Sequence, residues 1–251
     1  MNGFSYKNIY GSKKYNEFIE RQRNAIDGKF IHNTMNCKLS DGFSAECINY
    51  SDKEQKDKSY NIVASKIILK NADKAIYEYY HFYSNGHIYM NIIHHKNGHR
   101  YYPFHVDRYG ISFLDVDTLE VYNYIPEGYL HSDDRICGES FIINYIDYDI
   151  ESNLIAYGGY YRSDSFKVMT DIMVGDFSDP LNFNPHLVNL RDILDLEWNY
   201  DSIGFREWKN NRLYVLCYDA HDYYGVNDSE EKSVSIEELR KLINELTVKG
   251  K

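Results

Sequence analysis

The sequence predicts a mainly β fold of propeller-like antiparallel blades, about three of them and not necessarily closed into a ring, with a helix at each end. A strand–turn–strand unit recurs about every 60 residues. Tyrosine, whose ring packs well on a pleated surface, occurs 26 times against only four prolines. An AT-rich genome would also enrich tyrosine, so this count supports the class without deciding it. Helical spacing of apolar residues marks the two ends of the chain.

In each repeat an aromatic strand leads through a polar turn into a strongly apolar strand. The units cover 76–93, 141–160 and 203–218, with turns at 84–86, 151–153 and 209–211. The first two units continue into an apolar strand that ends in an acidic turn, at 110–117 and 171–180, and the first adds a strand at 119–125. Four such strands are typical of a propeller blade, which needs neighbours to cover its faces. After the third unit we expect a loop at 219–232.

Two domains are predicted, 1–59 and 60–251, with the first packed on the second. The first domain begins with a helix over 12–27, because its apolar residues recur at helical spacing. Ser12 can cap this helix, and Gly28 can end it.

Strands follow the first helix in two pairs. They are predicted at 34–39, 43–49, 61–70 and 75–83. The turns at 40–42 and 71–74 separate the members of each pair, since Gly and Asn tolerate the backbone angles of tight turns. The stretch 51–59 is charged and has no apolar residue, so it is expected to be a solvated loop.

The C-terminal helix has the strongest local signal. Ser235 followed by Glu238 forms a capping box. One apolar face follows, made of Ile236, Leu239, Leu242, Ile243 and Leu246. This helix is expected to cap the blades, where it could cover an exposed strand edge.

Composition narrows the class of protein. A chain of 251 residues can bury a core without disulfides, and its four cysteines, which form no CxxC pair, are expected to be free thiols. The net charge of −10 opposes nucleic acid binding and favours a basic partner. No apolar run reaches the roughly 18 residues of a membrane span, and residues 1–10 lack the apolar segment of a signal peptide. We therefore expect a cytoplasmic protein that does not associate with a membrane.

The units resemble blades of the WD-repeat and related β-propeller families, although they lack the Trp-Asp and Gly-His pairs. The stretch 139–180, with Asn153–Tyr161 reading NLIAYGGYY and Asp176–Pro180 reading DFSDP, looks like a family of uncharacterised bacterial proteins with propeller-like blades. The resemblance covers about 60–218. It implies the fold and a bacterial origin, and it carries no catalytic residues to this chain.

Histidines gather between residues 87 and 105. They are His87, His94, His95, His99 and His105. No HxxxH helix or HxH strand pair with a carboxylate in register is present, so surface or hydrogen-bonded histidines are favoured. His94 with His99 across a loop is the weak candidate for a metal site.

A second group follows the last apolar strand. Asp219, His221 and Asp222 could form an acid–base pair or a metal corner beside Tyr223 and Tyr224. Strand ends also carry such residues for turn geometry alone.

Acidic pairs recur at the predicted turns. They are Asp115 and Asp117, Asp133 and Asp134, Asp147 and Asp149, and Asp176 and Asp179. Two carboxylates can flank a sugar in a glycosidase, but Asp also caps turns in blade-like repeats. Gly158 and Gly159 could open a floor for a ligand or could kink their strand. The chain has no GxGxxG, P-loop or GxSxG motif, so no cofactor is predicted.

Tyrosines beside acidic residues suit the binding of a basic protein surface, although many of them must cover sheet faces as packing. The predicted binding residues are Tyr101, Tyr102, Tyr160, Tyr161, Asp219, His221, Asp222, Tyr223 and Tyr224.

The leading hypothesis is a non-enzymatic bacterial interaction module, an immunity-type or inhibitor protein whose acidic, Tyr-rich face binds a basic partner. The chain could also form a homo-oligomer that completes the stack of blades. The alternative is a carbohydrate-binding or glycoside-processing domain that uses Asp and Tyr at blade loops. A third hypothesis is a metal-dependent hydrolase centred on His94, His99 and Asp219.

Overall fold

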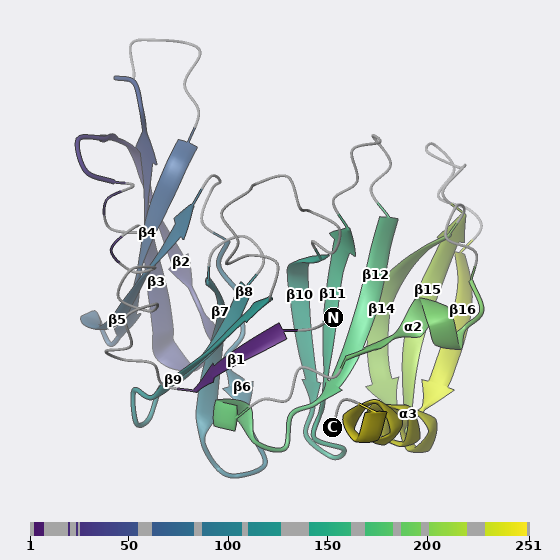
Figure 1. The fold of residues 1–251 in the computed structure, drawn as a ribbon. Helices are drawn as coiled ribbons and strands as arrows, with labels where there is room; N and C mark the ends of the chain where they lie inside the picture. Colours follow the sequence, from purple (N-terminus) through teal and green to yellow (C-terminus); the bar gives the residue numbers. More distant parts are fainter. Residues whose placement is uncertain are drawn as a thin grey trace. The chain divides into compact units, whose positions relative to one another are not determined.

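The computed structural model describes residues 3–7, 20, 24, 26–54, 62–82, 87–106, 110–126, 141–161, 169–182, 187–196, 201–219 and 229–249. Within these residues the strands form four open sheets of three to five strands (Figure 1). The chain divides into an N-terminal unit, residues 4–125, and a C-terminal unit, residues 126–251 together with the first three. The predicted class, mainly β with blade-like antiparallel sheets, is confirmed.

The first sheet of the N-terminal unit is a four-stranded antiparallel meander. Its strands, in order across the sheet, are β2 (Phe30–Lys38), β3 (Phe43–Ser51), β4 (Ile62–Asn71) and β5 (Lys74–Phe82). The turn η1 (Ser40–Gly42) holds Asp41 at φ 57° and Gly42 at φ 77°. The β4–β5 turn also holds Ala72 and Asp73 at positive φ, as tight hairpins require. These strands and turns confirm the sequence predictions.

The second sheet has the strand order β1-β9-β8-β7-β6. The strands are β1 (Gly3–Lys7), β6 (Ile93–His94), β7 (Arg100–Val106), β8 (Gly110–Asp115) and β9 (Val121–Pro126). Of the predicted unit 76–93, the first strand is present as β5, which pairs with β4, but the prediction of a strand at 87–93 is wrong, because residues 87–92 are not in a strand. The tight turn after β4 closes its own hairpin, so β5 already has a neighbour. The first meander therefore begins at β2, earlier in the chain than the first sequence repeat suggests.

Aromatic rings join the two sheets of the N-terminal unit. Tyr79 on β5 packs on Phe104 of β7 with ring centroids 4.4 Å apart. The hydroxyls of Tyr79 and Tyr102 lie 3.2 Å apart in a hydrogen bond. Burial raises the pKa of both phenols above the ordinary value. The alternate residues of β3 that face this core are buried from Phe43 to Ser51.

The C-terminal unit begins with a second four-stranded meander. Its strands are β10 (Phe141–Asp149), β11 (Leu154–Tyr161), β12 (Met169–Asp176) and β13 (Val188–Asn189), followed by the short helix α2 (Leu190–Ile193). A 3-10 turn, η3 (Pro180–Asn182), lies between β12 and β13. The predicted strands 141–148 and 154–160 are confirmed.

The last sheet consists of β14 (Asp201–Lys209), β15 (Arg212–Asp219) and β16 (Ser229–Ser235), and the helix α3 (Ile236–Lys249) follows at once. The prediction of a loop up to residue 232 is wrong, since 229–235 pair with β15 as an edge strand. The first three residues of this edge strand are exposed, and Val234 near its end is buried in the core.

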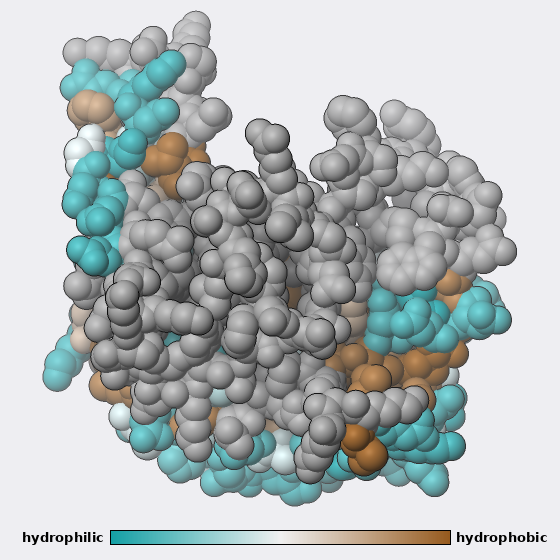
Figure 2. Space-filling model, viewed as in Figure 1, coloured by the Kyte–Doolittle hydropathy of each residue, from teal (hydrophilic) through white to brown (hydrophobic). Residues whose placement is uncertain are grey.

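One apolar cluster joins the two sheets of the C-terminal unit with α3. Its members include Leu154, Ile172, Val174, Ile203, Leu213, Val215, Leu239 and Ile243. Figure 2 shows apolar side chains gathered between α2 and α3. Ser235 Oγ accepts a hydrogen bond from Glu238 N over 3.2 Å, so the predicted helix cap is confirmed. The helix contacts β12, β13 and β16.

The predicted helix over 12–27 lies largely outside the described residues. Within it, Glu20 and Asn24 have helical backbone, and Gly28 follows in a turn at φ 67°. The predicted domain boundary at 59/60 also lies outside them, in 55–61, although β3 and β4 on either side of it are paired neighbours.

Candidate functional site

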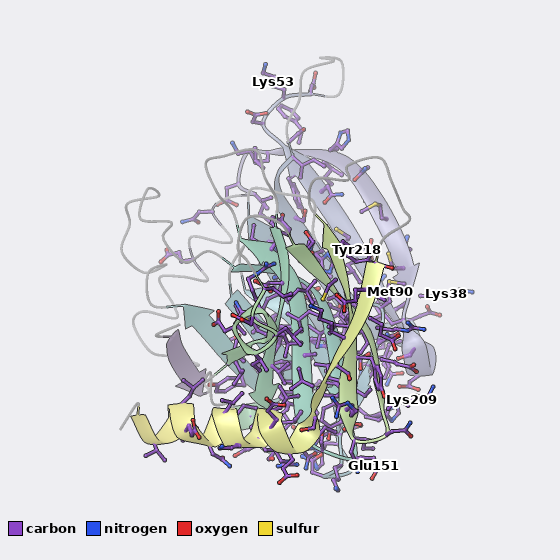
Figure 3. All side chains as sticks on the ribbon, turned by 90° about the vertical axis from the view of Figure 1, so that its right-hand side faces the viewer. Lys38, Lys53, Met90, Glu151, Lys209 and Tyr218 are labelled. Carbon is purple, nitrogen blue, oxygen red and sulfur yellow. The ribbon has the colours of Figure 1, made fainter. Side chains whose placement is uncertain are left out.

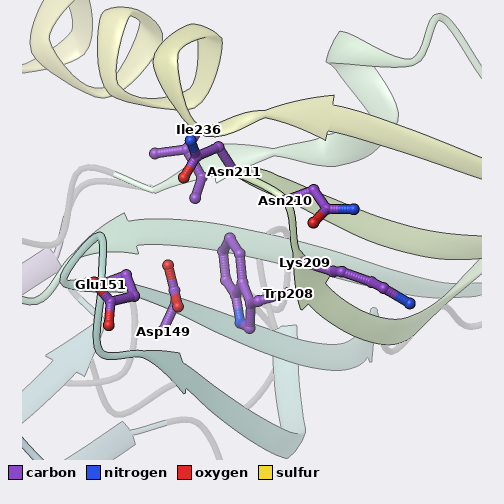
Figure 4. Close-up of a pocket in the computed structure, with 7 residues that line it drawn as sticks. All are labelled: Asp149, Glu151, Trp208, Lys209, Asn210, Asn211 and Ile236. Atoms are coloured by element: carbon purple, nitrogen blue, oxygen red, sulfur yellow. The ribbon is translucent and has the colours of Figure 1, made fainter.

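A hollow of about 300 Å³ lies where the two sheets of the C-terminal unit present neighbouring turns (Figure 4). It is lined by Asp149, Glu151, Trp208, Lys209, Asn210, Asn211 and Ile236. One wall is the end of β10 with its turn, and the other is the β14–β15 turn with the first residue of α3. Glu151 and Lys209 project at the same end of their sheets (Figure 3).

The turns that form the hollow owe their shape to asparagines. Asn210 and Asn211 take φ of 50° and 56°, and Asn153 in the other turn takes 54°. Asparagine tolerates this left-handed region better than most residues. The start of α3 is tied to one turn, because Ile236 N donates to the carbonyl of Asn211 over 3.0 Å. Arg240 on α3 donates to the carbonyl of Ser152 in the other turn, so the helix connects both walls.

A row of aromatic rings runs from β10 to Trp208. Tyr145 and Phe205 have ring centroids 5.1 Å apart, and Phe205 and Trp208 6.3 Å. Tyr145 lies over Gly158, its partner on β11, where a Cβ would meet the Tyr145 Cβ at 3.4 Å. The space above Gly158 is thus filled by this ring, and β11 pairs with β12 without a register shift. On the other side, β10 shifts register between Ile143 and Tyr145, directly opposite Gly159 and Gly158, so the glycine pair does mark an irregularity of the sheet, while a ligand floor there stays a prediction.

Two carboxylates project from one face of β10, because Asp147 and Asp149 are two residues apart on a strand. The Tyr145 hydroxyl donates to Asp147 Oδ2 over 2.9 Å. Asp149 Oδ2 accepts from Ser152 N over 3.1 Å, which holds the turn. Burial raises the pKa of Asp147 above its ordinary value, and the charge of Asp149 adds to this, while the Tyr145 and Trp208 donors partly oppose it. Trp208 Nε1 is buried without a hydrogen bond of standard geometry, yet its N–H still favours the Asp147 carboxylate.

The arrangement can bind a small polar molecule. Carboxylates and side-chain amides accept and donate hydrogen bonds, Lys209 adds a cation, and Trp208 adds an aromatic surface. Of these residues, sequence reasoning considered only Asp149, as one of several acidic turn pairs. Trp208 was missed, although it is one of only two tryptophans and directly precedes a turn.

A second cluster, in the N-terminal unit, brings together one histidine and two carboxylates that could hold a metal ion. The ligand atoms of His99, Asp115 and Asp117 all lie within 4.8 Å of one another. Their oxygens are already engaged: Asp115 accepts from His99 Nδ1 at 2.6 Å and from two turn N–H groups. Asp117 pairs with Arg100, whose guanidinium lowers the pKa of that carboxyl and would repel a cation. His99, Asp115 and Asp117 are better explained as a hydrogen-bonded network that holds the turn after β8.

His94 lies outside that cluster. Its Nε2 lies 2.6 Å from Asp41 Oδ2, whereas His99 is hydrogen-bonded to Asp115. The two histidines therefore have different carboxylate partners. Asp219 ends β15 in the other unit. The third hypothesis therefore has no assembled site among the described residues.

Other histidines form a buried ring cluster in the N-terminal unit. The ring of His105 lies 5.4 Å from that of His81 and 5.3 Å from that of His87. Its Nε2 is hydrogen-bonded to the Tyr89 hydroxyl at 3.0 Å. These contacts are those of hydrogen-bonded core histidines.

The predicted binding residues differ in how far the structure buries them. Tyr101 and Tyr102 are 2% and 0% exposed, so the expectation that they present a binding face is wrong. Both lie on β7, and the rings of Tyr102 and its neighbours on β5 fill the space between the two sheets. Tyr160 is half-buried on β11.

The side chains of the other predicted binding residues lie outside the described part of the chain. Tyr161 and Asp219 lie in strands, with side chains outside the described part. His221, Asp222, Tyr223 and Tyr224 lie wholly outside it. Of the cysteines, Cys37, Cys47 and Cys217 are free thiols, and Cys137 is not among the described residues.

Comparison of the chain with known proteins found similarity among solved structures, but not among protein families or curated proteins. No family model matches the chain, and no curated protein matches it. Among solved structures, it is similar to an α-L-arabinanase of Cellvibrio cellulosa, with 12% identity and a TM-score of 0.34, over 87% of this chain and 77% of that one. Among the described helices, none has the length and apolar character of a membrane span.

Proposed function

We propose that this chain binds a carbohydrate in the hollow beside Trp208. The observation that supports this most directly is the combination of two carboxylates that line the hollow, Asp149 and Glu151, with the aromatic row that ends at Trp208. Sugar hydroxyls are satisfied by carboxylate and amide groups, and the apolar face of a sugar ring packs on an aromatic ring. This is the carbohydrate-binding alternative, now assigned to different residues.

The size of the hollow limits the ligand. Its volume of about 300 Å³ is at the small end of ligand sites. The ligand is thus a short oligosaccharide that places roughly one sugar ring in the hollow. The lining carries two carboxylates, Asp149 and Glu151, against one cation, Lys209, so it favours a neutral sugar over an acidic one.

The test is a glycan array with the full chain, followed by calorimetric titration of the best oligosaccharide. Trp208→Ala should weaken binding at least tenfold, which corresponds to about 1.4 kcal/mol. Glu151→Gln, an exposed change at the rim, should weaken it less. Tyr218→Ala removes an exposed aromatic ring that does not line the hollow and should leave affinity unchanged. Absence of any bound glycan, with the protein folded by circular dichroism, would overturn the proposal.

A second candidate function, protein binding, is favoured by one observation, the exposed edge strand β2. An immunity-type role and a basic partner stay predictions. Of the residues on which they rest, Tyr101 and Tyr102 are buried, Tyr160 is half-buried, and the side chains of the others lie outside the described residues.

A further inference from the structure

Strand β2 is an edge strand with an exposed apolar surface. It lies at the outer end of the order β2-β3-β4-β5, and seven of its nine residues are exposed. Phe30, Ile31 and Met35 are 44%, 61% and 40% exposed. An edge strand presents backbone N–H and C=O groups that another strand can pair with. An edge of this kind is therefore able to accept a further strand.

The charge pattern of β2 permits pairing with itself. Lys38 is its only acidic or basic side chain apart from His32, and Figure 3 shows Lys38 reaching outward. The edge strand β16 instead carries Glu230, Glu231 and Lys232 in seven residues. Charges on an edge oppose strand addition, because like charges would meet across the new pair. β2 lacks this protection.

We infer that β2 pairs antiparallel with β2 of a second copy, about a two-fold axis within residues 33–36. A β-bulge at His32 disturbs the first part of the strand, so 33–38 is its regular part. In any such register Lys38 lies opposite a residue between Gly28 and Thr34 of the second copy. A parallel pairing would align Lys38 with itself, and this favours the antiparallel arrangement.

A second copy fits β2 better than a charged foreign segment does. Each chain has a net charge of −10, so most faces of two copies repel each other. β2 is a stretch without acidic residues, where two copies can approach and remove three exposed apolar side chains from water. One strand pair buries less than the roughly 1,200 Å² of a stable interface. The dimer is therefore weak and depends on concentration.

Sedimentation equilibrium of the full chain tests this inference independently of carbohydrate binding. The wild type should show a monomer–dimer equilibrium. Thr34→Glu, an exposed change near the axis, should weaken association at least tenfold, and so should Thr34→Lys. A mixture of these two variants should recover dimers, because opposite charges then face each other.

Met90→Glu is the matched control, since Met90 is 51% exposed in the same unit but is not on β2. It should dimerise like the wild type. A wild type that stays monomeric at about millimolar concentration would overturn the inference. A dimer that both Thr34 variants leave intact would also overturn it, because association would then use another surface.

Discussion

Each unit contains a buried polar network, and the two networks differ in charge. In the C-terminal unit, Arg191 of α2 and Asp171 of β12 are both 0% exposed, with Nε and Oδ2 3.0 Å apart. In the N-terminal unit, the buried Asn49 accepts from Ser65 Oγ at 2.5 Å and donates to Asn33 Oδ1 at 2.7 Å. The first network is ionic and the second is neutral. A buried charge depends on its partner far more than a buried amide does, because the desolvation cost of the charge is larger.

The largest expected effect comes from breaking the ionic pair. Arg191→Met should destabilise the protein by roughly 3–5 kcal/mol, since Asp171 would stay buried without its cation. Urea unfolding followed by circular dichroism measures this change. The double variant Asp171→Leu/Arg191→Met serves as control and should recover much of the loss. If the double variant were less stable than the single one, the uncompensated charge would not be the cause.

Breaking the neutral network should cost less. Asn49→Ala should destabilise the protein by about 1–3 kcal/mol, because Ser65 and Asn33 lose a buried partner but no charge is left behind. The matched control is Asn36→Ala, an exposed change on β2, which should stay within about 0.5 kcal/mol of the wild type. A loss equal to that of Arg191→Met would remove the distinction between the two networks.

The smallest expected effect is a change in how the free energy of unfolding depends on pH. Burial raises the pKa of Asp171 above its ordinary value, although Arg191 opposes this. With the folded pKa raised, the native state holds this proton longer than the unfolded state. The contribution of Asp171 is therefore fully present below about pH 3.8, its ordinary value, and is lost as pH rises through the folded pKa.

The measurement is the slope of the free energy of unfolding against pH, compared between the wild type and the variants Asp171→Asn and Asn49→Ala. The wild type should lose stability relative to Asp171→Asn as pH rises above about 3.8. Asn49→Ala, which changes no titrating group, should run parallel to the wild type. A wild-type slope parallel to that of Asp171→Asn would contradict the raised pKa.

Local signals predicted much of the fold. The turn at 40–42 and the cap at Ser235 depend on residues close together in the chain, and both form as expected. The division into repeats went wrong at β5, because two aromatic strands can each pair with several neighbours. Tyr101 and Tyr102 were placed on the surface because alternation shows that a strand has two faces but not which face a second sheet covers.

The candidate site was predictable only in part. Asp147 and Asp149 were recognisable as an acidic pair at a turn, while their meeting with Trp208 was not. The Asp149 turn and the Trp208 turn are separated by β11, β12, β13, α2 and β14, and only the packing of the two sheets with α3 brings them together.

The sequence by itself determined where strands, turns and the last helix form, because backbone preferences and caps act over a few residues. Only the tertiary structure decided which strands pair, which tyrosines are buried and which turns share a hollow. These outcomes depend on contacts between distant segments, and many alternative partners for a strand have similar pairing energies until one packed core selects among them.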